Sequence, residues 1–151
     1  MQAEAALQRG WAAHEAGDWR AAERDYDEAA RRDPSSAWAF YRLGVLASNN
    51  RLHGAAEAHF RRAIAVDPDF MPPHYELGAL HAAAGDFESA AVLLERAVDL
   101  APQDPHARLQ LGLAYAALGR DTEAAAEFAA ARDLAVEVPG VLASSVPAEA
   151  P

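Results

Sequence analysis

The sequence predicts an all-α fold, a solenoid of four helical hairpins and therefore eight helices. Its composition and its internal repetition both support this. The chain has 40 alanines but only ten β-branched residues; alanine is the strongest helix former, whereas β-branched residues favour strands. The chain also repeats every 34 residues, which is enough for two helices and their turns. With 151 residues and no cysteine, the fold must depend on stacked helices rather than on disulfide bonds.

Five sequence columns keep the 34-residue register. Glycine recurs in the expected first helix of each unit, at Gly10, Gly44, Gly78 and Gly112. Alanine forms two columns in the second helices, at Ala22, Ala56, Ala90 and Ala124 and at Ala29, Ala63, Ala97 and Ala131. A larger side chain stands between them, at Tyr26, Phe60, Leu94 and Phe128, and proline closes three units at Pro34, Pro68 and Pro102. We expect the small residues where two helix backbones come close, with the larger residue filling the remaining gap.

Hydrophobic spacing and turn residues predict where the helices begin and end. The expected first helices cover 3–16, 37–49, 71–84 and 105–118, and the second helices cover 18–32, 52–66, 86–100 and 121–135. Five side chains are placed to cap helix N-termini, because Ser and Asp accept hydrogen bonds from the first free backbone N–H groups. They are Ser36, Asp104 before Pro105, Asp18, Asp86 and Asp121.

The turn of the second hairpin departs from the pattern. Arg51 stands where the other hairpins have Gly17, Gly85 and Gly119. Glycine in that column indicates a left-handed backbone, which is unfavourable for arginine. We therefore expect the turn around Arg51 to take another conformation, assisted by Asn49 or Asn50.

The columns, together with Leu-Gly at 43–44, 77–78 and 111–112, resemble the tetratricopeptide repeat family. The resemblance implies a right-handed superhelix in which the first helices line a concave surface, and it implies protein binding without naming a partner. The expected array covers 1–136, with repeats at about 3–36, 37–70, 71–104 and 105–136. The remaining residues, 137–151, are rich in Pro, Ala and Ser. We interpret them as a tail or linker, although Val141 and Leu142 could instead cover the last repeat.

Helical geometry divides the aromatic stretch AWAFYRLG into two surfaces. Gly44 must face its own hairpin partner, which places Phe40 and Leu43 with it in the core. Spacings of three, four and seven residues place another set together on the opposite face: Trp38, Tyr41, Arg42, Val45 and Asn49. The same positions in the first repeat are Glu4, Leu7, Gln8, Trp11 and Glu15.

We predict that this face binds a partner. The candidate residues are Trp11, Trp38, Tyr41, Arg42, Asn49, Tyr75, Glu76 and His106. Apolar residues on the face, such as Leu7, Leu109 and Leu113, could instead pack between repeats. For Trp38, Tyr41 and Tyr75 we favour binding, because amphipathic aromatics are typical interface anchors. Arg42 is the only fixed positive charge on the face. The face is therefore a poor match for an acidic peptide tail, and an apolar helix or extended peptide fits better.

Composition argues against several other functions. The net charge is −10, which disfavours nucleic acid, and no apolar stretch approaches the roughly 18 residues that a membrane span requires. The histidine spacings suggest no metal site, and neither a cysteine nucleophile nor a phosphate-binding loop is present. We expect no enzyme activity, no cofactor and, since no secretory signal or lipid-attachment cysteine is visible, a cytoplasmic location.

Three hypotheses about function remain. The favoured one is an adaptor, scaffold or assembly factor that binds a peptide or helix of another protein. The second is a non-catalytic module of a larger enzyme, joined to it by the Pro/Ala-rich segment. The third is a self-associating scaffold, a homo-oligomer formed through the terminal repeat.

Overall fold

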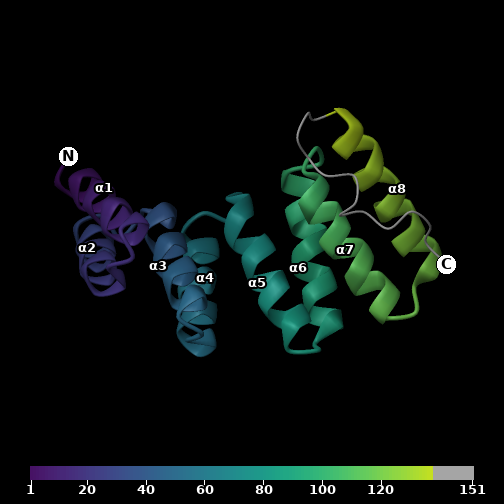
Figure 1. The fold of residues 1–151 in the computed structure, drawn as a ribbon, viewed down its shortest axis with the longest axis horizontal. Helices are drawn as coiled ribbons and strands as arrows, with labels where there is room; N and C mark the ends of the chain where they lie inside the picture. The colour runs from purple at the N-terminus through teal and green to yellow at the C-terminus, as the bar shows by residue number, and fades with distance from the viewer. Residues whose placement is uncertain (138–151) are drawn as a thin grey trace. The chain divides into compact units, whose positions relative to one another are not determined.

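The computed structural model describes residues 1–137, so the interpretations of the tail lie outside the described residues. Within 1–137 the chain forms eight helices and no strand (Figure 1). It divides into two compact units, Met1–Pro73 and His74–Pro151, which are considered separately.

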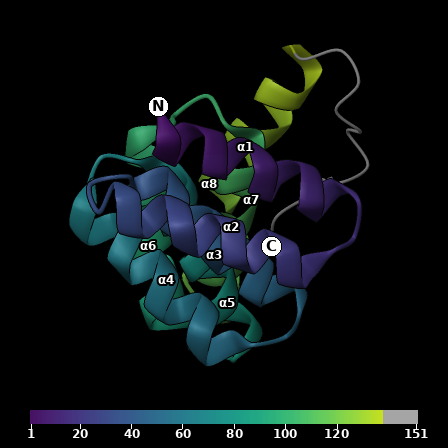
Figure 2. The same cartoon turned by 90° about the vertical axis from the view of Figure 1, so that its left-hand side faces the viewer.

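The first unit contains two helical hairpins. Helices α1 (Gln2–Glu15) and α2 (Trp19–Arg32) pack against each other, as do α3 (Ala37–Asn49) and α4 (His53–Val66). Helix α2 also packs against α3, which stacks the two hairpins. The end-on view in Figure 2 shows α1 and α2 side by side.

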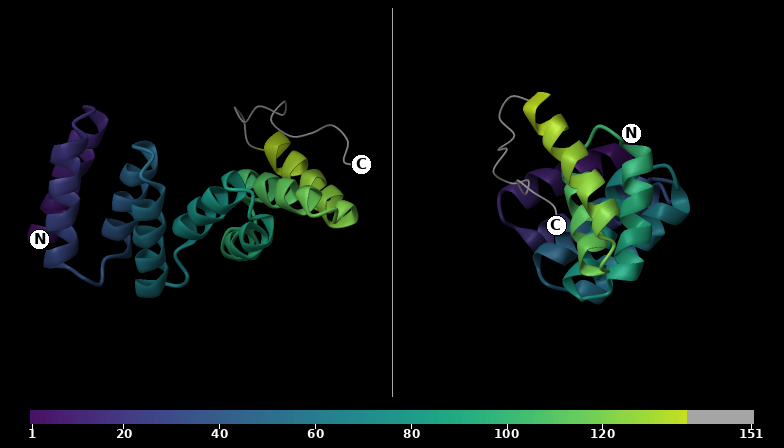
Figure 3. Two further views of the ribbon diagram at one scale, coloured as in Figure 1. Left: turned by 90° about the horizontal axis from the view of Figure 1, so that it is seen from below. Right: turned by 90° about the vertical axis from the view of Figure 1, so that its right-hand side faces the viewer.

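The second unit repeats this arrangement. Helix α5 (Met71–Ala83), which begins at the end of the first unit, precedes α6 (Phe87–Leu100), α7 (Pro105–Ala117) and α8 (Asp121–Glu137). Helix α6 packs against α7, and α7 against α8, whose pairing is visible on the right of Figure 3. The observed helices agree with the expected segments to within two residues at each end.

The glycine column lies where the sequence predicts close packing. A Cβ atom added to Gly44 would lie 2.5 Å from the Phe60 ring, and one added to Gly10 would lie 2.6 Å from the Tyr26 ring. Both rings are fully buried. Glycine is therefore required in this column because a large side chain from the second helix occupies the space that any other residue would need.

The core of the first unit follows the alanine columns. Ala22 and Tyr26 of α2 pack against Leu43 and Leu46 of α3. Phe40, which we expected beside Leu43 in the core, is only half-buried, and the Arg62 guanidinium lies 5.1 Å from its ring centroid. Its ring thus lies at the edge of the core, with a cation over its face.

Four of the five expected caps are present. Each accepts a hydrogen bond from a backbone N–H of the first turn: Asp18 from Ala21, Ser36 from Ala39, Asp86 from Ser89, and Asp104 from His106 and Ala107. The expectation for Asp121 is wrong, because α8 already begins at that residue. Asp121 lies in the first turn, where its charge suits the helix dipole.

The turn after α3 does not take the alternative conformation that we expected. Arg51 itself has φ 61°, close to the φ of 79°, 82° and 75° at Gly17, Gly85 and Gly119. Asn50 assists by donating its side-chain N–H to the Leu46 carbonyl at 2.9 Å. The packing of the hairpin thus imposes a left-handed conformation on arginine.

Replacing Arg51 with glycine should therefore stabilise the first unit. The left-handed conformation costs an L-residue roughly 1–2 kcal/mol, and the added freedom of glycine in the unfolded chain offsets part of that gain, about 0.4–1 kcal/mol. We expect the free energy of unfolding in urea to rise by about 0.5–1 kcal/mol. Arg51→Ala removes the same charge but keeps the strain, and an equal gain in that control would contradict the explanation.

Candidate partner-binding face

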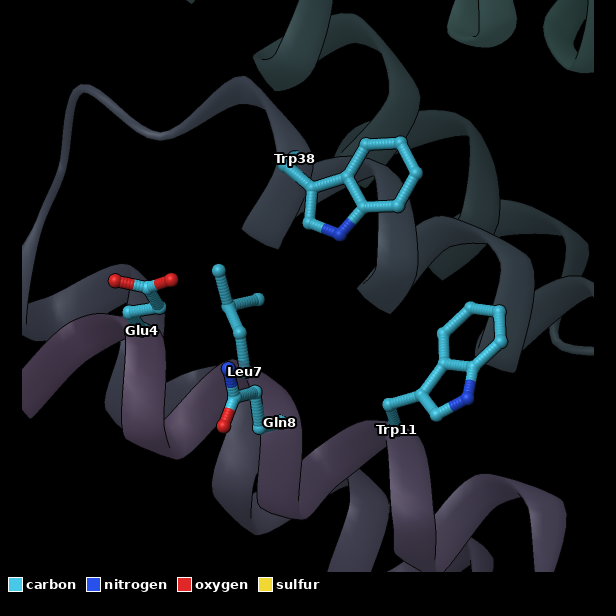
Figure 4. Close-up of a pocket in the computed structure, with 5 residues that line it drawn as sticks. All are labelled: Glu4, Leu7, Gln8, Trp11 and Trp38. Atoms are coloured by element: carbon cyan, nitrogen blue, oxygen red, sulfur yellow. The ribbon is translucent and has the colours of Figure 1, made fainter.

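A hollow of about 330 Å³ lies on the face that α1 and α3 share in the first unit (Figure 4). It is lined by Glu4, Leu7, Gln8, Trp11 and Trp38. The sequence placed all five on one face by helical spacing, and the structure brings them together around a single hollow. We call this site the Trp11–Trp38 hollow.

The two tryptophans expose much of their surface although both are fixed in place. Trp11 is 43% exposed and Trp38 is 44% exposed. Trp38 lies against the rings of Tyr41 and Phe70, with centroids 5.5 Å and 5.7 Å away, and the Arg42 guanidinium lies 4.1 Å from the Trp11 ring centroid. The indoles are thus ordered by their neighbours, which lowers the entropy cost of binding against them.

Tyr41 contributes to packing as well as to this face. Its side chain is half-buried, and its ring lies 6.1 Å from Phe60 and 5.6 Å from Phe70. Removing Tyr41 would therefore disturb the core around Phe60, whereas Trp38 packs against Tyr41 and Phe70 at the edge of the hollow.

Phe70 belongs to the aromatic cluster, although the sequence pattern did not predict it. It lies just before α5, in the column where the other repeats have the capping residues Ser36 and Asp104. An aromatic residue in a capping column is the signal that could have identified it. Its ring contacts both Trp38 and Tyr41 and so orders the aromatic cluster.

Arg42 lies on the predicted face, and its guanidinium already has stacking and hydrogen-bond partners. Besides stacking on Trp11, it donates from Nε to the Tyr26 hydroxyl at 3.3 Å, and Nη2 lies 3.3 Å from His14 Nδ1. Because arginine only donates hydrogen bonds, Nδ1 must be the accepting nitrogen of His14.

His14 links Arg42 to Asn49, and this role was also missed. Its Nε2 lies 3.2 Å from the Asn49 amide nitrogen. With Nδ1 accepting from Arg42, the neutral ring has its proton on Nε2, which donates best to the amide oxygen of Asn49 if the side-chain amide is rotated by half a turn. The bridge therefore requires a neutral histidine.

Acidification should weaken this bridge. Burial and the charge of Arg42 lower the pKa of His14, while Glu15 opposes them; the Tyr26 ring and Asn49 complete its surroundings. Since the folded state favours neutral His14, its contribution to stability is present above the pKa of an unfolded histidine, about 6.5, and is lost as the pH falls through the lower folded pKa.

We expect the urea midpoint of the wild type to fall more between about pH 7.5 and pH 5.5 than that of His14→Gln. The variant cannot be protonated at this position. Since burial also lowers the pKa of His59, a His59→Gln control separates the two contributions. Equal pH dependence of wild type and His14→Gln would contradict the assigned bridge.

The other candidate residues lie in the second unit. Tyr75 and Glu76 of α5 are half-buried, and burial raises the pKa of both side chains. The charge of Asp104, at the start of α7, also raises the pKa of Tyr75. His106 is exposed on the first turn of α7. Tyr75, Glu76 and His106 remain predicted site residues.

The second unit also contains a hollow whose residues the sequence pattern did not bring together. It has a volume of about 370 Å³ and is lined by Glu88, Ala91, Val92, Glu95, Leu118 and Arg120. Its polar groups engage one another: the Tyr115 hydroxyl donates to Glu95 at 2.7 Å, and Arg120 stacks 4.3 Å from the Tyr115 ring centroid and pairs with Glu123. Burial and the hydrogen bond to Glu95 raise the pKa of Tyr115, whereas the charge of Arg120 opposes them.

Among residues 1–137, no group of three or more His, Cys, Asp or Glu side chains could hold a metal ion. No helix in that range is long and apolar enough to cross a membrane. His74 of α5 is buried, and His81 Nδ1 lies 3.3 Å from the Asp86 carboxylate.

Stacked helical hairpins with a 34-residue period define a class of repeat proteins that function in protein interaction. Two family models described as tetratricopeptide repeat match residues 3–69 and 81–139. The chain therefore belongs to the tetratricopeptide repeat family, whose repeats are generally non-catalytic interaction modules.

Solved structures agree with this assignment, although no curated protein matches the chain in sequence. MamA has a TM-score of 0.81 and 26% identity, over 89% of this chain and 79% of MamA. YrrB, described as having an unusual peptide-binding site, has a TM-score of 0.77 and 26% identity, over 85% of this chain and 66% of its own. An O-GlcNAc transferase from Thermobaculum terrenum has a TM-score of 0.68 and 29% identity, over 90% of this chain and 25% of the enzyme.

Proposed function

We propose that the chain is an adaptor or scaffold module that binds a peptide or helix of a partner protein at the Trp11–Trp38 hollow. The observation that supports this most strongly is the pair of fixed, partly exposed indoles around one hollow. Such aromatic anchors account for much of the binding energy in known interfaces. YrrB, a relative in fold, is described as binding peptides, which fits the same proposal.

The face is unsuited to clamping an acidic tail. Arg42 is its fixed cation, and its donors already meet Trp11, Tyr26 and His14. A carboxylate ligand would have to compete with these contacts. An apolar segment needs only the exposed indole and Leu7 surfaces, so binding does not require the Arg42 contacts to break.

A pull-down from the source cell with quantitative mass spectrometry tests the proposal. We expect at least one protein to be retained by the wild type and lost by a Trp11→Ala/Trp38→Ala double variant. Trp19→Ala is the matched control, since Trp19 is 41% exposed but lies on α2, away from the hollow. Identical sets of retained proteins for the wild type and the double variant would contradict the proposal.

A second candidate is a non-catalytic module of a larger enzyme. The likeness to one quarter of an O-GlcNAc transferase favours it, because that match covers 90% of this chain and 25% of the enzyme. Sequencing the gene beyond both ends of this chain tests the idea. A catalytic domain in the same reading frame would support it, and stop codons flanking the repeat array would exclude it.

A further inference from the structure

We propose that the Trp11–Trp38 hollow selects a basic–aliphatic segment of its partner, with an aliphatic side chain between the two indoles and a Lys or Arg against Glu4. This inference depends on the proposed function, since it specifies what the same site binds. The requirement for a basic residue in the partner goes beyond partner binding itself.

The aliphatic part follows from the size and lining of the hollow. Its 330 Å³ equals the volume of on the order of ten water molecules, enough for roughly one or two aliphatic side chains. Leu7 rises between Glu4 and Trp11 in Figure 4, and the Trp38 indole lies across from it. Burying a Leu, Ile or Val side chain against these surfaces removes apolar area from water on both partners.

The basic part follows from which charges are free. Glu4 is the one charged side chain among the five that line the hollow. Arg42 is not among them, and its guanidinium stacks on Trp11 and has hydrogen-bond partners in Tyr26 and His14. Glu4 is exposed, and among residues 1–137 no ion pair engages its carboxylate. Residues 1–73, the unit that carries the hollow, have 9 Arg and 11 Asp or Glu, a net charge of −2. A cationic segment must therefore be selected by Glu4 at short range rather than by the charge of the unit as a whole.

The spacing of the two features limits the sequence of the ligand. Glu4 and Trp11 are seven residues apart on α1, which is about 10 Å along the helix axis. An extended peptide advances about 3.3 Å per residue. A basic residue about two or three positions from the aliphatic anchor would therefore reach Glu4 while the anchor occupies the hollow.

Selection from a phage-displayed library of random dodecapeptides tests the inference without knowledge of the natural partner. We expect the enriched peptides to contain Leu, Ile or Val with Lys or Arg two or three positions away, and to be depleted in Asp and Glu. The strongest peptide is then synthesised and its affinity measured by fluorescence polarisation.

Charge exchange provides the sharper measurement. Glu4→Lys should weaken binding of the selected peptide by about fivefold or more, because an attraction becomes a repulsion. A peptide with its Lys or Arg replaced by Glu should bind Glu4→Lys better than it binds the wild type. Glu23 is exposed on α2. Glu23→Lys changes the total charge equally, and we expect it to cause only a small, salt-sensitive loss of affinity and no preference for the Glu-substituted peptide.

The outcomes separate this inference from the proposed function. Acidic enriched peptides, or equal effects of Glu4→Lys and Glu23→Lys, would overturn the basic–aliphatic selection while leaving a partner-binding hollow intact. Peptides that bind the Trp11→Ala/Trp38→Ala variant as well as the wild type, or a selection that enriches nothing, would overturn both.

Discussion

Replacing Phe60 with alanine should lower the free energy of unfolding by about 3–5 kcal/mol, the usual cost of deleting a buried aromatic side chain. Phe60 is fully buried, and its ring occupies the space beside Gly44 and lies 6.1 Å from Tyr41. Equilibrium denaturation in urea, followed by circular dichroism, measures the loss.

A double-mutant cycle with Gly44 tests the reason for that loss. In the wild type, Gly44→Ala places a methyl group 2.5 Å from the Phe60 ring and should destabilise the fold. In the Phe60→Ala background the clash is gone, and the higher helix propensity of alanine should restore up to about 1 kcal/mol. Additive effects of the two substitutions would show that the residues do not share the space.

Replacing Trp38 with alanine should weaken partner binding by about 1–3 kcal/mol, or roughly 5- to 150-fold in affinity. Its indole is 44% exposed at the hollow and packs against Tyr41 and Phe70, so the affinity should fall while the urea midpoint falls less than in Tyr41→Ala. Fluorescence polarisation with a peptide selected on the wild type measures it.

Two controls accompany that measurement. Trp19→Ala removes an indole of similar exposure from α2 and should leave the affinity unchanged. Tyr41→Ala should lower both affinity and stability, because its ring contacts Phe60 and Phe70 as well as Trp38. Loss of affinity in Trp19→Ala equal to that in Trp38→Ala would point to another surface.

Much of the fold could be predicted because the same residue pattern occurs in four repeats, and each repeat supports the same arrangement of two helices. Gly44 alone could be a helix defect, but four glycines at one register, each beside a large residue of the second helix, define a close helix pair. The same reasoning failed at Arg51, where hairpin packing outweighs the local preference of arginine, so the column of glycines was a better guide than the residue itself.

The site was less predictable, because helical spacing gives the face of a residue but not what its side chain contacts. The sequence placed Arg42 on the face as an available cation. The structure shows its guanidinium stacked on Trp11 and bonded to residues of the first hairpin. Phe70 lies outside any helix, so no helical periodicity could place it against Trp38. Contacts between hairpins depend on how they stack and on side-chain rotamers, neither of which the columns specify.

The most direct test of the central claim uses the three tryptophans of the chain as internal probes. Each has one indole N–H, which gives a separate signal in a ¹H–¹⁵N spectrum, and their exposures are alike at 43%, 41% and 44% for Trp11, Trp19 and Trp38. On titration with the selected peptide, we predict that the signals of Trp11 and Trp38 shift while that of Trp19 stays in place. A shift of Trp19 with Trp11 and Trp38 unmoved would contradict binding at the hollow.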